Sequence, residues 1–274
     1  GLGEHSRRYL HMISALLDAS FIVVADDHAG HGRTAMQSGQ WADAGDNSAE
    51  VVISDELTLQ QQLTGQFNDL PWVVFGHSWG SLRPPPPPPT PRLDGLALGG
   101  VVAQLRGLET TLDHEALAKA MATNPAGPAP ESLVAQMFDG CTDRLSEGDG
   151  PTGWVARNRD VVADYGKDKF NNFGAQMSTR FLQGFADIYD MANGEGFYAA
   201  MPKIPIALFA GSEDPAGNFG TGVQAVAQRL RRDGHDVELH LYDGLRHEVH
   251  NEPESRADVE SSLVTFVDRV AKRN

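Results

Sequence analysis

Cysteine is almost absent from this sequence, since Cys141 is the only one among 274 residues. An intrachain disulfide is therefore excluded, which is typical of a reducing compartment, and we expect a cytoplasmic protein. Cys141 lies in the polar stretch 139–144, without the strand and turn that present a nucleophile, so it is not a candidate for that role. The sequence also lacks any apolar run near the ~20 residues of a membrane-spanning helix.

Basic residues are also scarce. Lys and Arg number 22 against 37 Asp and Glu, which gives a net charge of −15. Nucleic-acid binding and docking on anionic lipid both need a basic face, so neither partner is expected. We interpret the charge as a solvated acidic surface. A hydrophobic content of 41% is enough for a sizeable core and argues against global disorder.

What the sequence does contain is an alternation of short apolar runs with longer amphipathic segments. The short runs are apolar on both faces, as strands buried between two helical layers are. Their alternation with helices predicts an α/β fold with a mostly parallel, doubly wound sheet. The expected strands are 21–27, 72–77, 94–100, 204–211 and 236–244, and the expected helices are 6–19, 48–67, 219–233 and 254–272.

The strand rhythm stops after about residue 100 and resumes at 202. The segment between them has helical patterns at 112–122 and 175–193. We therefore expect a core of residues 1–100 and 202–274 and an inserted helical cap of residues 101–201. The second helix carries an apolar face that packs on the core, lines an acyl-chain pocket, or does both. That face is made of Met177, Phe181, Phe185, Ile188 and Ala192.

The stretch 76-GHSWG-80 fits the pattern G-x-S-x-G directly after an expected strand, which is the context of a nucleophile elbow. There a strained backbone projects the hydroxyl of Ser78 beyond the end of the sheet. Gly76 and Gly80 are expected to let the strand and the next segment approach closely. A serine hydroxyl is a weak nucleophile, so it needs a histidine base and a carboxylate that orients the histidine.

Two later loops supply these partners in the chain order serine, acid, histidine. Asp214 follows the expected strand 204–211, and His247 follows the strand 236–244. Open α/β sheets place their sites beyond the carboxyl ends of such strands. Ser78, Asp214 and His247 are therefore the predicted catalytic triad.

Several neighbours of these residues were weighed as alternatives. Glu213 is the competing acid, although the position before a proline favours Asp214. His250 is interpreted as a residue at a helix start or one supporting the site, and His77 as pointing into the fold. His28 and His31 suggest a metal site, but no cysteine or convergent carboxylates accompany them in the sequence. We interpret both as loop residues near the mouth of the site and predict no metal.

With these residues identified, the sequence resembles the monoacylglycerol lipase and lysophospholipase branch of the α/β-hydrolases. The resemblance spans nearly the whole chain and is carried by 1-GLGEHS-6 with Tyr9, 27-DHAGHGRT-34, 76-GHSWGS-81, 211-GSEDP-215 and 242-YDGLRHEVHNE-252. It implies a serine carboxylester hydrolase that needs no metal or organic cofactor, with a helical cap over an acyl-binding pocket. The implied substrate is a small acyl ester such as a monoacylglycerol or lysophospholipid.

The resemblance also implies an oxyanion hole of two backbone N–H groups. One follows the nucleophile and belongs to Trp79, and the other belongs to Leu2, because Gly1 matches the glycine of the family's His-Gly pair. The family usually has Arg where Ala29 stands and Gly where Arg7 stands. Its strands before the Gly-Leu-Gly block are absent here, so we expect a longer full-length protein and leave a signal peptide open.

The prolines from Pro84 to Pro89 are the largest departure from the family, which has a helix there. Six prolines predict polyproline II, because proline disrupts a helix interior. Three interpretations stay open: an error in the sequence, an insertion that remodels the helix, and a docking motif for a partner. If the tract breaks the elbow, the alternative function is a non-catalytic α/β-hydrolase-fold binding protein. Oligomeric state, acyl length and leaving group are not decided by the sequence.

Overall fold

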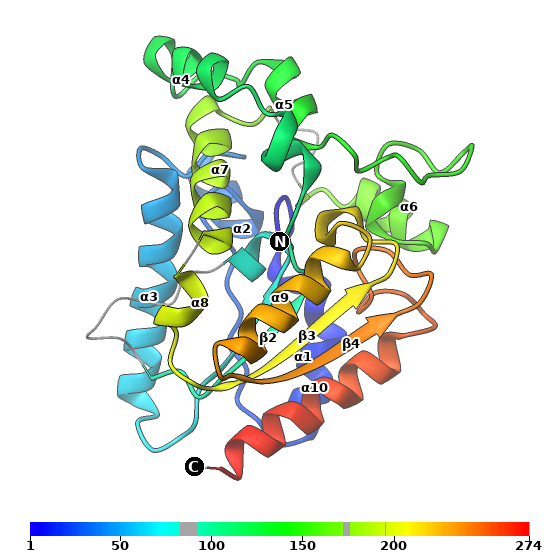
Figure 1. Cartoon of the computed structure of the whole chain (residues 1–274). Coiled ribbons are helices and arrows are strands. Elements are labelled where there is room, and N and C mark those ends of the chain that lie inside the picture. Colours follow the sequence, from blue (N-terminus) through cyan, green and yellow to red (C-terminus); the bar gives the residue numbers. More distant parts are fainter. Residues whose placement is uncertain (83–91, 172–175, 195, 274) are drawn as a thin grey trace.

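A four-stranded parallel sheet forms the centre of the computed structural model, which describes residues 1–82, 92–171, 176–194 and 196–273. Its strands run in chain order, and the two middle ones are buried along their length. The strands are β1 (Val73–His77), β2 (Gly95–Gly99), β3 (Pro205–Gly211) and β4 (Asp236–Tyr242). All four were predicted, with ends that differ by at most two residues, and the parallel α/β fold is confirmed (Figure 1).

Helices cover both faces of the sheet because successive side chains of a strand point to opposite faces. From β3, Ile206 and Leu208 pack toward α9 (Thr221–Arg232). The alternate residues Ala207 and Phe209 pack toward α10 (Arg256–Ala271), together with Met12 of α1 (Leu10–Asp18). Figure 1 shows α9 on one side of the sheet and α1 with α10 on the other, which is the predicted doubly wound arrangement.

The strand predicted over 21–27 is wrong. No residue from Phe21 to Asp27 is assigned to a strand, and Ile22 and Val24 are 58% and 46% exposed. A strand exists only through hydrogen bonds to a neighbour. Within the described ranges β1 pairs with β2 alone, and no strand lies beside 21–27. The apolar β-branched composition of this segment was therefore not sufficient to make it a strand.

The chain between β2 and β3 is helical, as predicted, and its described residues form no named strand. Asp113, Asn158 and Ser178 cap three of its helices with side-chain oxygens, which explains where those helices begin. Its helices are α4 (His114–Thr123), α5 (Glu131–Met137), α6 (Arg159–Lys167), α7 (Thr179–Asn193) and α8 (Phe197–Ala200), with short turns η3 (Gly107–Thr111) and η4 (Gly153–Val155). The remaining elements are η1 (Ser6–Tyr9), α2 (Gly32–Ser38), α3 (Ser48–Gln66), η2 (Ser78–Leu82) and η5 (Pro215–Gly217).

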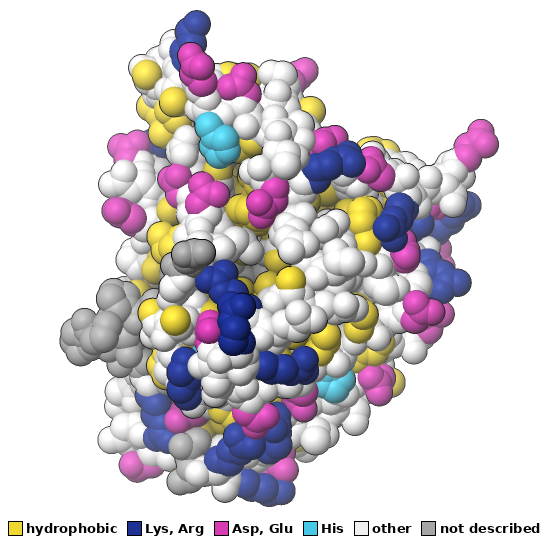
Figure 2. Space-filling view, in the orientation of Figure 1, with side chains coloured by type: hydrophobic (Ala, Val, Ile, Leu, Met, Phe, Trp, Pro, Cys, Tyr) yellow, Lys and Arg dark blue, Asp and Glu magenta, His cyan; other side chains and the backbone are white. Residues whose placement is uncertain are grey.

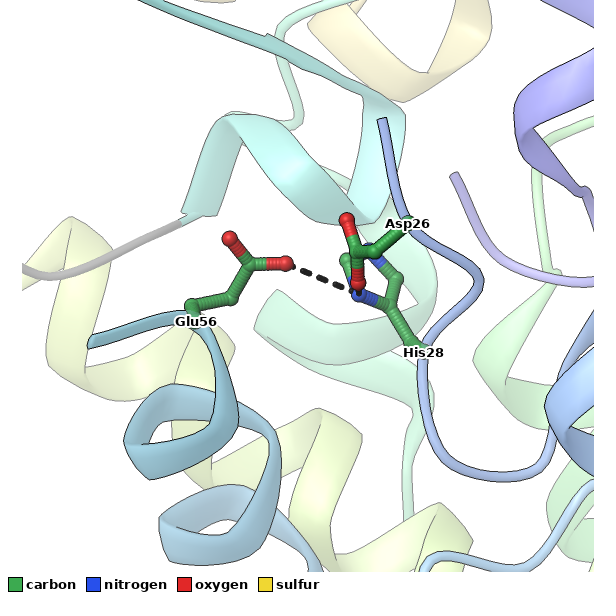
Figure 3. A group of neighbouring side chains, drawn as sticks. All are labelled: Asp26, His28 and Glu56. Atoms are coloured by element: carbon green, nitrogen blue, oxygen red, sulfur yellow. Dashed lines mark ion pairs between the residues drawn. The ribbon is translucent and has the colours of Figure 1, made fainter. Parts of the chain in front are cut away.

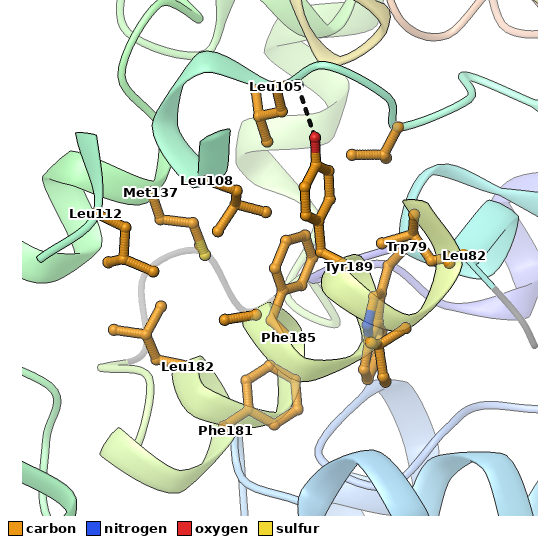
Figure 4. Close-up of a cluster of buried hydrophobic side chains, with 14 of the residues drawn as sticks. Trp79, Leu82, Leu105, Leu108, Leu112, Met137, Phe181, Leu182, Phe185 and Tyr189 are labelled. Carbon is orange, nitrogen blue, oxygen red and sulfur yellow. Dashed lines mark hydrogen bonds between the residues drawn. The ribbon is translucent and has the colours of Figure 1, made fainter. Parts of the chain in front are cut away.

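The apolar face of α7 joins this helical region to the end of β1 (Figure 4). Phe181 and Phe185 contact the indole of Trp79, which follows Ser78 directly. The hydroxyl of Tyr189 accepts a hydrogen bond of 3.1 Å from the backbone N–H of Leu105, so the one polar group of this face is satisfied. Four of the five residues predicted for this face are buried, and Phe181 and Phe185 among them pack beside the residue that follows the predicted nucleophile. Met177 instead precedes α7 and is partly buried.

Three further predictions concern the charged surface, membrane-spanning helices and the proline tract. Figure 2 shows Lys and Arg side chains interspersed with Asp and Glu on one face of the molecule, as a solvated charged surface would be. In the part of the chain that the structure describes, no helix combines the length and apolarity needed to cross a membrane. Pro84 to Pro89 lie outside the described residues.

Candidate active site

Ser78 stands at the junction of β1 and the short helical turn η2, with a left-handed φ of 54°. This conformation is strained for a residue with a side chain and is found where function requires it. A Cβ added to Gly76 would collide with the carbonyl oxygen of Gly80, so the close approach expected at Gly76 is present. The same expectation for Gly80 is wrong, because a Cβ there would meet nothing within 4 Å. Gly80 takes part in the contact with Gly76 through its backbone carbonyl, and a side chain at position 80 would not interfere with that contact.

Asp214 and His247 come together from the loops that follow β3 and β4. Nδ1 of His247 lies 2.9 Å from Oδ2 of Asp214, and both side chains are buried. The other oxygen of Asp214 accepts a hydrogen bond of 2.9 Å from the N–H of Ala216, which fixes the carboxylate at the start of η5. Glu213 instead faces solvent and pairs with Arg144. The geometry thus joins Asp214, and not Glu213, to the histidine.

The environment of His247 favours its charged form. Burial alone would lower the pKa of the imidazole, but the charge of Asp214 and its hydrogen bond more than offset burial, and the pKa is raised above 6.5. Nε2 has no hydrogen-bond partner among the described residues. The histidine therefore has one nitrogen held by a carboxylate and the other available, which is the arrangement of a general base.

Ser78 and His247 line the same pocket, together with Leu2. Most of the other lining residues are apolar, and they come from the loop after β2, from the helical region and from η5: Val102, Leu105, Phe138, Cys141, Trp154, Val155, Phe185 and Ala216. Such a pocket suits an apolar substrate group whose reactive end meets a few polar atoms. Trp79, the residue after Ser78, is 4% exposed, and its indole belongs to the apolar cluster of Figure 4.

His77, His250 and Cys141 are buried near the pocket. His77 points into the fold, as predicted, with Nδ1 lying 3.6 Å from Oε2 of Glu4. His250 is not at a helix start: it is a buried residue stacked on Tyr9, with ring centroids 5.1 Å apart. Burial raises the pKa of the Cys141 thiol to about 12, which agrees with the absence of a nucleophilic role for this residue.

His28 was predicted to lack convergent carboxylates, and that prediction is wrong (Figure 3). Its Nδ1 lies 3.1 Å from Asp26 and 3.0 Å from Glu56, a residue of α3. Burial opposes charge on His28, but the two carboxylates raise the pKa of its imidazole to about 9. The imidazolium is thus the cation that this cluster holds at neutral pH. Neither His28 nor His31 lines the pocket of Ser78, and both pack against Trp79 instead.

A buried ionic cluster beside the pocket was not predicted from the sequence. Arg8 donates to Glu4 at 2.7 Å and to both oxygens of Glu248, at 2.5 and 2.7 Å. Glu4 also accepts a hydrogen bond from the hydroxyl of Tyr9. Both carboxylates line the pocket. The sequence could have indicated only the pair of Glu4 and Arg8, which are four residues apart and can meet on a helical turn. Glu248 is 240 residues from Arg8 in the chain, and nothing in the sequence around it indicates this contact.

Comparison with known proteins identifies the family of the chain. The family model described as "Serine aminopeptidase, S33" matches residues 1–83 and 91–254. A solved structure described as a lipase in its open form is 82% identical, with a TM-score of 0.96 over 99% of this chain and 88% of that one. A thermostable carboxyl esterase from Bacillus coagulans, solved with glycerol, is 36% identical, with a TM-score of 0.92 over the same shares.

A more distant relative is the monoacylglycerol lipase of Mycolicibacterium smegmatis. It is 27% identical over 280 residues, which cover 97% of this chain and 86% of the relative. Together these matches confirm the predicted resemblance to the monoacylglycerol lipase branch of the α/β-hydrolases.

Proposed function

The chain belongs to the serine aminopeptidase family of α/β-hydrolases, and on this premise we propose that it is a carboxylic ester hydrolase acting through Ser78, His247 and Asp214. One observation carries the assignment of residues. Ser78 has a strained backbone at the end of β1 and lines one pocket with His247, whose Nδ1 is bound by Asp214. Serine, base and orienting carboxylate are the three parts that acyl transfer requires.

Acylation begins when the Oγ of Ser78 attacks the ester carbonyl and its proton moves to Nε2 of His247. The C–O bond that forms converts the carbonyl into a tetrahedral oxyanion. Asp214 accepts a hydrogen bond from Nδ1–H, so it holds the tautomer that leaves Nε2 able to accept the proton and stabilises the imidazolium that results. Collapse of the oxyanion then breaks the bond to the alcohol, which leaves with the proton from Nε2.

Deacylation repeats these steps with water. His247 removes a proton from water, the hydroxide attacks the acyl-enzyme, and Ser78 leaves with the proton from Nε2. In both halves the backbone N–H groups of Leu2 and Trp79 are proposed to bind the oxyanion. A donor of this kind contributes about 3 kcal/mol to transition-state stability.

The proposed substrates are monoacylglycerols and similar acyl esters. The apolar lining of the pocket supports an acyl chain as one half of the substrate. The relatives described as a lipase, a carboxyl esterase with glycerol and a monoacylglycerol lipase support an ester, with a small alcohol as the other half. We propose residues 101–201 as the cap, because Leu105, Phe138, Trp154 and Phe185 of this region line the same pocket as Ser78.

Hydrolysis of amino-acid amides is the rival activity, since the family's description names a serine aminopeptidase. An aminopeptidase must bind the free ammonium group of its substrate, which needs a carboxylate that is not already paired. Glu4 and Glu248 are the carboxylates that line the pocket, and both are engaged by Arg8. The ester is therefore the preferred substrate class.

The test is labelling of the purified protein with a fluorophosphonate, followed by peptide mapping and by assays of monoacylglycerol and aminoacyl-p-nitroanilide hydrolysis. A single adduct on Ser78, ester hydrolysis, and loss of both in Ser78→Ala are expected. An unlabelled protein that binds but does not cleave acyl esters would instead establish the binding-protein alternative. Cleavage of the anilide in preference to the ester would establish the aminopeptidase.

A further inference from the structure

The loop that carries His247 is bound along its length by a segment of the helical region. We name residues 149–158 the strap and residues 244–252 the base loop. The backbone N–H of Glu248 donates to the carbonyl of Val155 at 2.8 Å, and the N–H of His247 donates to the carbonyl of Trp154 at 3.4 Å. The backbone of the proposed base is therefore positioned by a part of the chain that belongs to neither β3 nor β4.

The side chain of Arg246, the residue before His247, also binds the strap. Its guanidinium donates to Asp149 at 2.7 Å and to the carbonyls of Gly153 and Ala156 at 2.8 and 3.3 Å. The hydrogen bond from Arg246 holds the pKa of Asp149 below its ordinary value. The carbonyls of Gly153 and Ala156 flank those of Trp154 and Val155 in the strap. The side chain of Arg246 therefore determines where the middle of the strap lies.

Two more contacts complete the attachment. The ring of Trp154 lies against the imidazole of His247, with centroids 5.0 Å apart. At the far end of the base loop, the carboxylate of Glu252 accepts hydrogen bonds from the backbone N–H groups of Arg157 and Asn158. The strap is thus joined to the base loop at both ends and in the middle.

We propose that Arg246 is a positioning residue for His247, which acts by locking the strap 149–158 against the base loop. This inference rests on the proposed function, in which His247 is the base. Arg246 does not line the pocket of Ser78, so its effect passes through the strap and not through the substrate. Because the strap belongs to the proposed cap, the position of the base is coupled to that of the cap.

Without Arg246 the strap keeps its backbone hydrogen bonds to His247 and Glu248 and the bonds to Glu252, but it loses the guanidinium that holds Gly153, Ala156 and Asp149 together. His247 then samples orientations in which Nε2 is displaced from the Ser78 hydroxyl. A displacement of 1 Å can slow a reaction by about 10²-fold. Trp154 and Val155 of the strap also line the pocket, but its other apolar residues come from outside the strap, so the loss is expected mainly in kcat and less in KM.

The test compares Arg246→Ala, Arg246→Lys and Asp149→Asn with the wild-type enzyme on a monoacylglycerol. We expect kcat to fall by about 10²-fold in Arg246→Ala with a smaller change in KM, and the rate constant for fluorophosphonate labelling to fall in the same proportion as kcat. Arg246→Lys should recover part of the loss, because an ammonium keeps one bond to Asp149 but does not reach the carbonyls with the same fork. Circular dichroism and thermal unfolding verify that each variant is folded.

Arg159→Ala is the matched control. Arg159 pairs with the same Asp149 at 3.4 Å, but its side chain is 72% exposed and, among the described residues, no hydrogen bond or ion pair joins it to the base loop. Its removal should leave kcat and labelling at wild-type values. The proposal is overturned if Arg246→Ala keeps wild-type kcat, if its loss is confined to KM, or if Arg159→Ala loses as much. A wild-type protein without labelling or ester hydrolysis would instead contradict the proposed function.

Discussion

Nδ1 of His247 lies 2.9 Å from Oδ2 of Asp214, although 33 residues separate them in the chain. Two parallel strands bring them together, because β3 and β4 are neighbours and both residues lie in loops after the strands end. The carboxylate is 0% exposed, so its charge acts on the imidazole with little screening by water. This pair accounts for the direction of the His247 pKa shift and leads to the first two predictions.

Asp214→Asn should lower kcat by roughly 10⁴-fold, because an amide stabilises neither the required tautomer nor the imidazolium. Glu213→Gln is the control at the adjacent position. Glu213 is on the surface with Arg144, so its removal should change kcat by less than about twofold, as expected of an exposed pair. Steady-state kinetics on a soluble ester measure both. Equal losses in the two variants would contradict the assignment of the acid.

The pH dependence of kcat/KM should show an acid limb above pH 6.5. The base must be neutral to accept a proton, and the pKa of His247 is raised above 6.5 by Asp214, so protonation removes activity at a higher pH than for an ordinary histidine. In Asp214→Asn the residual activity should have its limb at lower pH, since burial is then opposed only by the smaller effects of the Glu248 and Glu4 charges. A limb that does not move between the two enzymes would show that another group controls it.

Gly76→Ala should destabilise the protein and abolish activity. Its Cβ would collide with the carbonyl of Gly80, and relieving such a clash costs about 1–3 kcal/mol in a packed interior. Gly80→Ala is the matched variant, because its Cβ meets nothing within 4 Å. Urea unfolding should therefore show a loss of stability in the first variant only. The opposite order would show that the two segments of the elbow do not approach as described.

Arg8→Ala should destabilise the fold by about 3–5 kcal/mol, the typical cost of leaving a buried carboxylate without its partner. Burial and the neighbouring Glu4 already raise the pKa of Glu248 to about 7, against the pull of Arg8. Without Arg8 that pKa rises further. A carboxyl whose folded pKa is raised loses stability as pH rises from its unfolded value through the folded one, so the deficit should be larger at pH 8 than at pH 6.

Urea unfolding at the two pH values measures this deficit. Arg7→Ala is the control, because Arg7 is the exposed neighbour in the same turn and should cost little at either pH. A deficit that is independent of pH would mean that Arg8 stabilises the fold by packing on Tyr165, over which its guanidinium lies, and not by compensating the carboxylates.

Local sequence was sufficient for most of the fold and for the candidate triad. The four runs that became strands are apolar enough to be buried by helices on both faces, and the G-x-S-x-G pattern follows one of them. Asp214 and His247 could be predicted because each follows a strand end, which is where such sheets place their sites. Each of these predictions, of the strands, the elbow, Asp214 and His247, depends on residues within a short distance along the chain.

The errors and omissions concern contacts between distant segments. The segment 21–27 has the composition of a strand, but a strand also needs hydrogen bonds to a neighbouring strand, and no strand of the described residues pairs with it. The Glu56 carboxylate lies beside His28 only because α3 packs beside that loop, whereas Asp26 is two residues from His28 in the chain. The local sequence around His28 does not indicate that Glu56 lies beside it.

The sequence by itself therefore determined the four strands of the sheet, the elbow and the identity of the candidate acid and base. Only the tertiary structure decided what surrounds them: the partners of Arg8, the carboxylates at His28, and the strap that Arg246 holds against the base loop. The physical reason is the range of the forces involved. Backbone preference and hydrophobic periodicity act between neighbours in the chain, whereas ion pairs and hydrogen bonds act between neighbours in space, which folding alone creates.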